Sequence, residues 1–566
     1  MTMSRQRSSQ RVHRSRTSLP IIALSVGILG VLLVCGVCWA GYQALQGGLA
    51  DAVPPPNEVV LRVAYSPEKA VLFRDLVDSF NRRGEKTPAG LTIRVEAVQL
   101  EPEEMLERAL AGEFQAITPD SSLWLDQLDR RYAERSGPDA TLVGPVTRYA
   151  VSPVVLIMWR DVAEQMGYPN RPIGWGDVLA RAQSDPDFKW SHPSTASASG
   201  ILATLAEFYA GAGKTRGLTE EDVNNRQVLD YVGALERTVR YYGEGEWATA
   251  QRVKQEGRSA LDAFVGQEQI VVWLRQQGVD VVAVYPVEGS LWEDHPLALL
   301  ETPGLNDDQR TAFERFSDYL TSEEAQMKVL ASGYRPADLS IPLDSPGSPL
   351  QPANGVDPNQ PQTALQIPPP AVVQVVQNAW WETKRRANIY LVVDTSGSME
   401  GQKIANVREA LRLFIDQVKS DRDSIGLITF NSQVYEDVPL DRLENNQAQL
   451  LAAVEGIRAG GNTALLDAVN RAYTLLQRAD DRERINAIVV MTDGLENASA
   501  ITLTRLTAQM RDGNRKGVPV LVFAIAYGED ADKEVLQRLA EATGGQMREG
   551  TLETIRNLYR ILSTYF

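Results

Sequence analysis

Residues 389–398 read Ile-Tyr-Leu-Val-Val-Asp-Thr-Ser-Gly-Ser and decide the fold of the C-terminal part of this chain. Five apolar residues predict a buried strand, and a polar loop containing glycine follows at once. Within 403–418, apolar residues recur at spacings of three and four, which indicates an amphipathic helix. Further strands are expected at 425–430, 487–491 and 520–525, an edge strand at 433–439, and a helix at 464–476. This alternation predicts a doubly wound, Rossmann-like α/β sheet flanked by helices.

Polar residues lie at the carboxyl ends of these strands, which is where open α/β sheets bind ligands. They come from three loops: Asp394, Ser396 and Ser398 after the first strand, Thr463 before a helix, and Asp493 after another strand. All five side chains offer oxygen, which hard divalent cations prefer, and two adjacent carboxylates repel each other unless a cation separates them. The set therefore predicts a divalent metal site, with Mg²⁺ as first choice and Mn²⁺ or Ca²⁺ as alternatives. Taken singly, each residue is also an ordinary turn or helix-cap residue.

This pattern resembles the von Willebrand factor type A family, whose metal-ion-dependent adhesion site reads Asp-x-Ser-x-Ser with a Thr and an Asp on later loops. All five positions match, and the resemblance covers about one third of the chain. It implies that the five residues bind the metal directly or through water. It also implies that the metal binds an acidic residue of a protein partner.

Residues 57–340 also alternate apolar runs with amphipathic helices, as two-lobed α/β modules do. Strands are expected at 59–65, 91–98, 154–159, 270–274 and 281–284, and a helix at 72–80. The region resembles bacterial extracellular solute-binding proteins in the segments 63–66, 120–122, 152–155, 193–200, 285–289 and 320–326. The resemblance implies a cleft between two lobes. Candidate ligand-binding residues are Ser66, Ser122, Ser197, Ser199, Gly200 and Tyr285.

Two of these positions, Ser66 and Ser199-Gly200, stand at expected helix starts. Free N–H groups there favour a small anion or polar solute. Glu68 beside the first position opposes an anion, and helix capping explains the same serines without a ligand.

The composition restricts the chemistry. With 57 Lys plus Arg against 73 Asp plus Glu, the net charge is −16, which makes nucleic acid an improbable partner. Three histidines and two cysteines argue against His-based zinc sites and Cys/His nucleophile pairs. Since no hydrolase motif or phosphate-binding loop is found either, the sequence predicts a binding protein rather than an enzyme.

The N-terminus predicts a membrane anchor. Residues 21–40 are almost wholly apolar and long enough to span a bilayer, and five arginines precede them. We therefore expect a basic cytoplasmic tail at 1–18, a transmembrane signal anchor at 19–42 and a stalk at 43–56, with the bulk outside the cell. A cleaved signal peptide and secretion is the alternative.

Two further segments complete the predicted organisation. Residues 341–371, which are rich in proline, predict an extended linker that lets the flanking modules move independently. The type A domain is expected at 372–566 with a leading helix and a core from about 388. Trp380 and Trp381 are interpreted as packing anchors, and the basic run 384–386 as a solvated face.

These observations favour a membrane-anchored surface protein that binds a protein partner through its metal site. The solute-binding-like module would then act as a sensor or second contact for a small polar solute. The alternative is a tethered solute-binding receptor of an ATP-driven importer, and a metal-assisted hydrolase ranks last.

Overall fold

The computed structural model describes residues 57–566 except 244, 419–421, 552–553, 556–558, 560–561, 564 and 566. The predicted tail, transmembrane helix and stalk lie outside the described residues. Of the helices that are described, none is both long and apolar enough to cross a bilayer.

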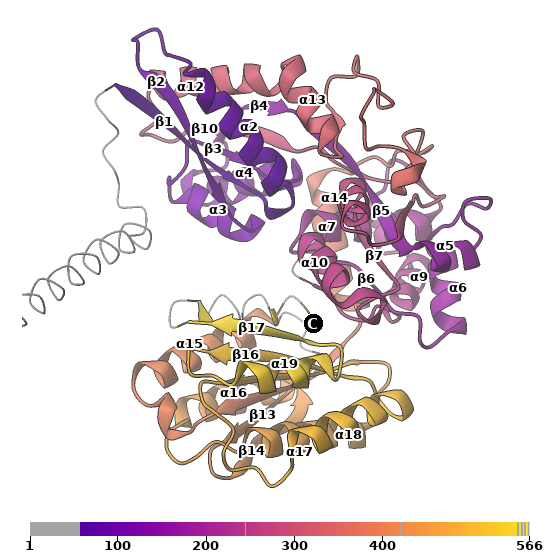
Figure 1. Cartoon of the computed structure of the whole chain (residues 1–566), viewed down its shortest axis with the longest axis vertical. Coiled ribbons are helices and arrows are strands. Elements are labelled where there is room, and N and C mark those ends of the chain that lie inside the picture. Colours follow the sequence, from indigo (N-terminus) through magenta and orange to yellow (C-terminus); the bar gives the residue numbers. More distant parts are fainter. Residues whose placement is uncertain are drawn as a thin grey trace, which may run out of the picture. The chain divides into compact units, whose positions relative to one another are not determined.

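The first lobe is a mixed five-stranded sheet in the order β2-β1-β3-β10-β4. Its strands are β1 (Glu58–Tyr65), β2 (Thr92–Gln99), β3 (Ala116–Thr118), β4 (Val143–Arg148) and β10 (Pro296–Leu300). The helical segments are η1 (Pro67–Lys69), α2 (Ala70–Arg83), α3 (Pro102–Leu110), α4 (Leu123–Ser136), α12 (Asp307–Leu320) and α13 (Glu323–Ala331). Strand β10 enters this sheet from far along the chain, so the lobe is built from two separate stretches (Figure 1).

The second lobe has a six-stranded sheet centred on β5 (Ala150–Trp159). The other strands are β6 (Trp190–Ser191), β7 (Ala263–Gln267), β8 (Val281–Val284), β9 (Trp292–Glu293) and β11 (Arg335–Pro336). The helical segments are α5 (Arg160–Gln165), α6 (Trp175–Ser184), α7 (Ala198–Ala212), α8 (Glu220–Val223), α9 (Arg226–Glu236), α10 (Glu246–Glu256), η2 (Gly257–Ser259) and α11 (Glu268–Gln276).

One predicted strand is wrong: residues 270–274 lie in the helix α11 rather than in a strand. The first three residues of the run Ile-Val-Val-Trp-Leu are β-branched, which is typical of strands. The run is apolar because this helix is buried over most of its length. A short apolar run does not distinguish a buried strand from a buried helix.

The proline-rich segment packs against the second lobe instead of forming an extended tether. Leu350, Val356 and Leu365 are buried, and the Tyr209 hydroxyl donates to the Gln366 carbonyl at 2.6 Å. A short 3₁₀ turn, η3 (Pro352–Asn354), precedes helix α14 (Pro370–Thr383), which packs on α7, α8 and α9. Spaced apolar side chains between the prolines provide the burial that composition alone does not reveal.

The C-terminal domain is the predicted doubly wound sheet, in the order β14-β13-β12-β15-β16-β17 (Figure 1). Its strands are β12 (Ala387–Asp394), β13 (Ser424–Phe430), β14 (Val434–Arg442), β15 (Ile485–Thr492), β16 (Val520–Tyr527) and β17 (Gln546–Gly550). All neighbours are parallel except the edge strand β14. The central strands are buried along their whole length and mostly apolar, because helices cover both of their faces.

Alternate residues of β12 define the two faces of this sheet. Ile389 and Leu391 pack with α15 (Gln402–Gln417) and α16 (Leu443–Gly456). Tyr390 and Val392 pack with α17 (Leu465–Ala479), α18 (Leu503–Lys516) and α19 (Lys533–Glu541). Period-two alternation thus orients the strand, and its carboxyl end points to the loop that begins at Asp394.

The basic run 384–386 is not a solvated face. Lys384 is buried and pairs with the equally buried Asp423 at 2.8 Å. The Arg385 guanidinium donates to the Val239 carbonyl at 2.7 Å, and its backbone N–H donates to the Tyr242 hydroxyl at 2.8 Å. Trp380 is a packing anchor as predicted, edge-on to Tyr242 at 5.1 Å.

Candidate functional site

Three loops meet at the carboxyl edge of the C-terminal sheet. The Gly397 N–H donates to the Gly461 carbonyl at 3.0 Å, and the Gly460 N–H donates to the Thr395 carbonyl at 2.8 Å. The Thr463 N–H donates to Asn497 Oδ1 at 3.0 Å, which joins the second loop to the third. Backbone contacts therefore fix the loops that carry the predicted ligands before any ion is considered.

The side chains of the predicted set converge. Ser396 Oγ and Ser398 Oγ are 3.0 Å apart, and Ser398 Oγ donates to Asp493 Oδ1 at 2.6 Å. A Cβ built on Gly494 would lie 3.4 Å from both Ser398 Oγ and Thr463 Oγ1. The two hydroxyls therefore face the same small space beside Gly494, and the structure brings residues from all three loops together.

Asp394 lies at the base of this group. It is fully buried, its Oδ1 accepts from the Ser396 N–H at 2.7 Å, and its Oδ2 accepts from the Thr492 hydroxyl. Burial raises the pKa of Asp394, and the nearby Asp493 adds to the rise, while the Thr492 hydroxyl opposes it. The Asp394 carboxyl group is therefore oriented by hydrogen bonds, and no positive charge among the described residues compensates for its burial.

Sequence reasoning did not single out two contributors, Thr492 and Lys403. The Lys403 ammonium, on α15, donates to Asp493 Oδ2, and its side chain is 30% exposed. A cation therefore already faces one of the two carboxylates. The signal for Lys403 was weak, since a lysine in the first turn of a helix is common on any surface.

The donor set fits a hard divalent ion. Asp394, Ser396, Ser398, Thr463 and Asp493 supply only carboxylate and hydroxyl oxygens, in the inventory that Mg²⁺ uses with water. Asp394, Ser396, Thr463 and Asp493 are buried, whereas Ser398 is exposed, so the group opens toward solvent on one side. Leu495, 62% exposed, stands two residues from Asp493.

A second site lies between the lobes of the middle module. A cavity of about 220 Å³ is lined by η1, α3 and the loop after β3 on one side and by α7 and α10 on the other. The predicted residues Ser197 and Ser199 both line it, and their hydroxyls are 3.4 Å apart. Ser66 lies next to the lining residue Pro67, is fully buried, and has an Oγ with no hydrogen-bond partner.

Three other predicted residues have different surroundings. Ser122 binds Asp294 through its N–H at 2.7 Å and through its hydroxyl. Tyr285 lines a separate cavity of about 640 Å³ and donates to Glu268. A Cβ on Gly200 would lie 2.0 Å from the Ser194 carbonyl oxygen, so this glycine is needed for close backbone packing.

The inter-lobe cavity is lined by acidic residues that sequence reasoning did not name as ligand-binding residues, although it remarked on Glu68 and quoted segment 120–122 for its resemblance. Glu68, Glu101, Asp120 and Glu246 all line it. Burial raises the pKa of Asp120 to about 6 and, with repulsion from Asp120, that of Glu246 to about 8. These residues come from four separate elements, so no local motif announced them.

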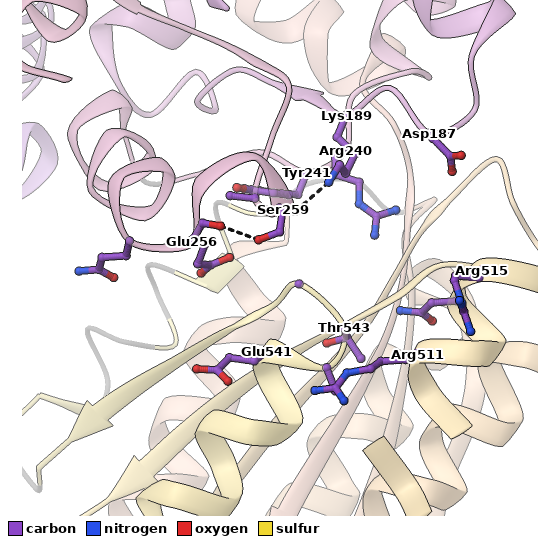
Figure 2. A pocket seen from close by; sticks show the side chains of 15 residues that line it. Asp187, Lys189, Arg240, Tyr241, Glu256, Ser259, Arg511, Arg515, Glu541 and Thr543 are labelled. Atoms are coloured by element: carbon purple, nitrogen blue, oxygen red, sulfur yellow. Dashed lines mark hydrogen bonds between the residues drawn. The ribbon is translucent and has the colours of Figure 1, made fainter. Parts of the chain in front are cut away.

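A larger pocket of about 780 Å³, lined by both basic and acidic side chains, lies between the second lobe and the C-terminal domain (Figure 2). Lys189 and Arg240 line it from the lobe, and Arg511 and Arg515 line it from α18. Lys189 is held by the Ser259 carbonyl at 2.8 Å. Burial, with nearby arginines, lowers the pKa of Arg240 to about 10. Asp187, Glu256 and Glu541 also line this pocket, so its charges are mixed, whereas carboxyl groups predominate in the inter-lobe cavity.

A buried polar cluster connects the second lobe to the start of the C-terminal domain. His192 Nε2 lies 3.3 Å from Glu236 and 3.9 Å from Glu207, and all three are fully buried. The Tyr242 hydroxyl donates to Glu236 at 2.6 Å while accepting from the Arg385 N–H. Burial and the neighbouring Glu236 raise the pKa of Glu207 well above its ordinary value.

These observations define a class: a two-lobed α/β fold with a cavity between its lobes, joined to a doubly wound domain with an oxygen-rich site at its sheet edge. Comparison with known proteins gives the families. Residues 61–335 match the bacterial extracellular solute-binding protein family, and residues 388–558 match the von Willebrand factor type A domain. The chain carries both domains.

Individual relatives resemble parts of the chain. Inter-alpha-trypsin inhibitor heavy chain H4 of Homo sapiens is 31% identical over 170 residues, which are 28% of this chain and 18% of that protein. The chain thus spans less than a fifth of that relative.

Two solved structures also match. A von Willebrand factor type A protein from Catenulispora acidiphila is 20% identical over 32% of this chain and 42% of its own, with a TM-score of 0.29. The sulfate-binding protein SubI from Mycobacterium tuberculosis H37Rv is 17% identical over 50% of this chain and 88% of its own, with a TM-score of 0.37.

Proposed function

We propose that this chain binds a protein partner through a divalent metal ion held by its type A domain. Asp394, Ser396, Ser398, Thr463 and Asp493 would hold the ion, and an acidic side chain of the partner would complete its coordination. The observation that carries the proposal is the linked set of oxygens from Ser396 through Ser398 to Asp493, at 3.0 and 2.6 Å. The metal would supply a positive charge that attracts a carboxylate.

The surroundings of the set support this function. Asp394 and Asp493 are fully buried, so leaving both ionised without a cation is costly, and Lys403 reaches only Asp493. Ser398 is exposed, which leaves a path for an outside ligand. The exposed Leu495 offers apolar area beside that path.

Calorimetric titration of the full chain with Mg²⁺, Mn²⁺ and Ca²⁺ tests the site. We expect one ion per chain for at least one metal, and loss of that binding in Asp493→Asn. Partner capture from the native cell surface should then require the metal and stop on addition of EDTA. Flat titrations for all three ions, or capture that survives EDTA, would contradict the proposal.

We further propose that the two domains lie outside the cytoplasm on a membrane anchor formed by residues 19–42. The support is the extracellular type of the solute-binding family and the apolar run at 21–40. Fractionation of cells should place the full chain in the membrane, resistant to carbonate washing. A mature N-terminus beginning after residue 45 in the soluble fraction would instead support a cleaved signal peptide.

A second candidate function is that of a receptor for a small solute. It is favoured by the cavity between the lobes, which two of the predicted serines line. Both domain families are typically non-enzymatic, and we propose binding rather than catalysis for each site.

A further inference from the structure

The inter-lobe cavity carries an excess of carboxyl groups over basic groups. Four carboxyl groups line it: Glu68, Glu101 and Asp120 from the first lobe, and Glu246 from α10 of the second. Among the described residues that line it, Arg548 of β17 is the one basic side chain. Glu293 lies close enough to repel Glu246, is fully buried, and has an unpartnered Oε1.

Asp120 is the group that points to a ligand. It is 5% exposed and lines the cavity, and its Oδ1 has no hydrogen-bond partner, although the Trp124 indole and the Ser121 N–H lie near enough to this carboxyl group to oppose the rise that burial causes in its pKa. Glu68 likewise has an Oε1 without a partner. Buried carboxylate oxygens are rarely left unsatisfied, because their desolvation is not recovered unless a donor or a cation reaches them.

The buried lysine nearby does not satisfy these oxygens. The Lys69 ammonium gives its two hydrogen bonds to the Pro119 carbonyl at 2.5 Å and to the Thr118 hydroxyl at 3.3 Å. Glu246, by contrast, accepts from the Gln267 backbone N–H at 2.9 Å and from its side-chain amide at 2.7 Å. Among the described residues that line this cavity, Asp120 and Glu68 are therefore the ones with a carboxyl oxygen that no donor reaches.

The size and lining of the cavity indicate which cation fits. About 220 Å³ is far more than one bare metal ion occupies, and Pro67, Pro102 and Trp247 add apolar surface to the walls. An indole beside carboxylates is the usual surrounding of an organic cation. An anion would meet four carboxyl groups, which opposes the anion expected at the helix starts.

We propose that the cleft binds a small organic cation carrying a primary ammonium or guanidinium group. Its N–H donors would go to Asp120 and Glu68, and Ser197 and Ser199 would hydrogen-bond the rest of the solute. The proposal rests on the receptor function given above as the second candidate. Arg548, a guanidinium from the C-terminal domain, is already placed at this cavity and competes with the solute for it.

The test is calorimetric titration of the full chain with agmatine, which carries both groups, in saturating Mg²⁺ so that the type A site is filled throughout. Glucose and sulfate are titrated in parallel as a neutral and an anionic solute. We expect agmatine to bind one to one, with at least about tenfold weaker binding in Asp120→Asn and in Glu68→Gln, each of which removes one carboxyl group from the proposed contact. Glu107→Gln, an exposed change on α3, is the matched control and should leave the affinity unchanged.

Thermal melts show whether each variant folds, and Glu68→Gln serves as the readout if Asp120→Asn does not. If both carboxyl variants fold and bind agmatine as tightly as the unaltered chain does, the assigned site is overturned. Binding of glucose or sulfate in place of agmatine would overturn the cation and leave the receptor function standing. If agmatine, glucose and sulfate all fail to bind, both the cation and the receptor function are overturned. None of these results bears on the metal site.

Discussion

The sheet-edge set and the inter-lobe cavity are both acidic, but they differ in how their carboxylates are satisfied. At the sheet edge, Asp394 and Asp493 each accept from hydroxyl or N–H donors, and Lys403 supplies a charge. In the cavity, Asp120 and Glu68 each keep one oxygen without a partner. A prearranged set of oxygens that opens to solvent would suit a hard ion that bridges to another protein, whereas unpartnered oxygens in a cavity between two lobes would suit a solute that brings its own donors.

The largest expected effect concerns the stability of the fold that carries the sheet-edge set, through the buried ion pair between Lys384 and Asp423. Lys384→Met should lower the free energy of unfolding by about 3–5 kcal/mol, because it leaves Asp423 charged and buried without its counterion. Denaturant unfolding followed by circular dichroism measures this. Lys516→Met, which removes an exposed partner of Asp512, is the control and should cost less than about 0.5 kcal/mol. Equal losses in the two variants would contradict the buried ion pair.

Next in size is removal of one ligand from the sheet-edge set. Asp394→Ala should weaken Mn²⁺ binding about 100-fold or more, since it deletes a carboxylate at the base of the set. Agmatine affinity should stay the same, which separates the two sites. The control is Asp416→Ala, an exposed change on α15. Unchanged Mn²⁺ affinity in Asp394→Ala would remove the basis for the metal site.

A smaller effect is expected from pH. Because burial raises the pKa of Asp120 to about 6 and of Glu246 to about 8, a rise from pH 6 to 8 ionises these groups and should strengthen agmatine binding about tenfold. The same ionisation costs folding energy, since both groups titrate lower in the unfolded chain, so the free protein should melt at a lower temperature at pH 8 than at pH 6.

Other charged or titratable groups act on the same cavity: Glu68, Lys69, Glu101, Glu293, Asp294, His295 and Arg548. Asp120→Asn and Glu246→Gln, separately and together, assign the pH effect by calorimetry. An affinity that falls as the pH rises would contradict a cation held by carboxylates.

The smallest effect concerns the competitor. Arg548→Gln should strengthen agmatine binding about threefold, because a charged side chain no longer shares the cavity. Arg548→Lys, which keeps the charge, should give a smaller gain. Weaker binding in Arg548→Gln would mean that this arginine supports the solute site.

The two sites also differ in how far the sequence predicted them. Asp394, Ser396 and Ser398 lie within five residues of one another, so their grouping is a local property. Thr463 and Asp493 could be added because loops at the carboxyl ends of neighbouring parallel strands meet at one edge of the sheet. Asp120 and Glu246 meet only because two lobes fold against each other; segment 120–122 was quoted for its resemblance, but only Ser122 was named from it as a ligand-binding residue, and nothing local marks Glu246. Ser122 and Gly200 were placed in the cleft from their sequence positions, but one is taken up by Asp294 and the other by backbone packing.

The same distinction explains the other errors. Lys384 looked solvated because its partner, Asp423, is 39 residues away. The run at 270–274 looked like a strand because hydrophobic patterning does not report which backbone a fully buried segment adopts. The prolines at 341–371 predicted an extended linker between independently moving modules, although the residues between them are apolar enough to anchor the segment.

Helix α14 has a practical consequence for anyone who transplants the C-terminal domain. The helix precedes that domain in the chain, yet Val372, Val376 and Trp380 face the preceding module. A graft cut at residue 371 would carry this apolar stripe into water and invite aggregation. A junction between Thr383 and Lys384 would leave the helix with its packing neighbours and keep Lys384 with its buried partner Asp423, so chimaeras that differ by this helix alone should differ sharply in soluble yield.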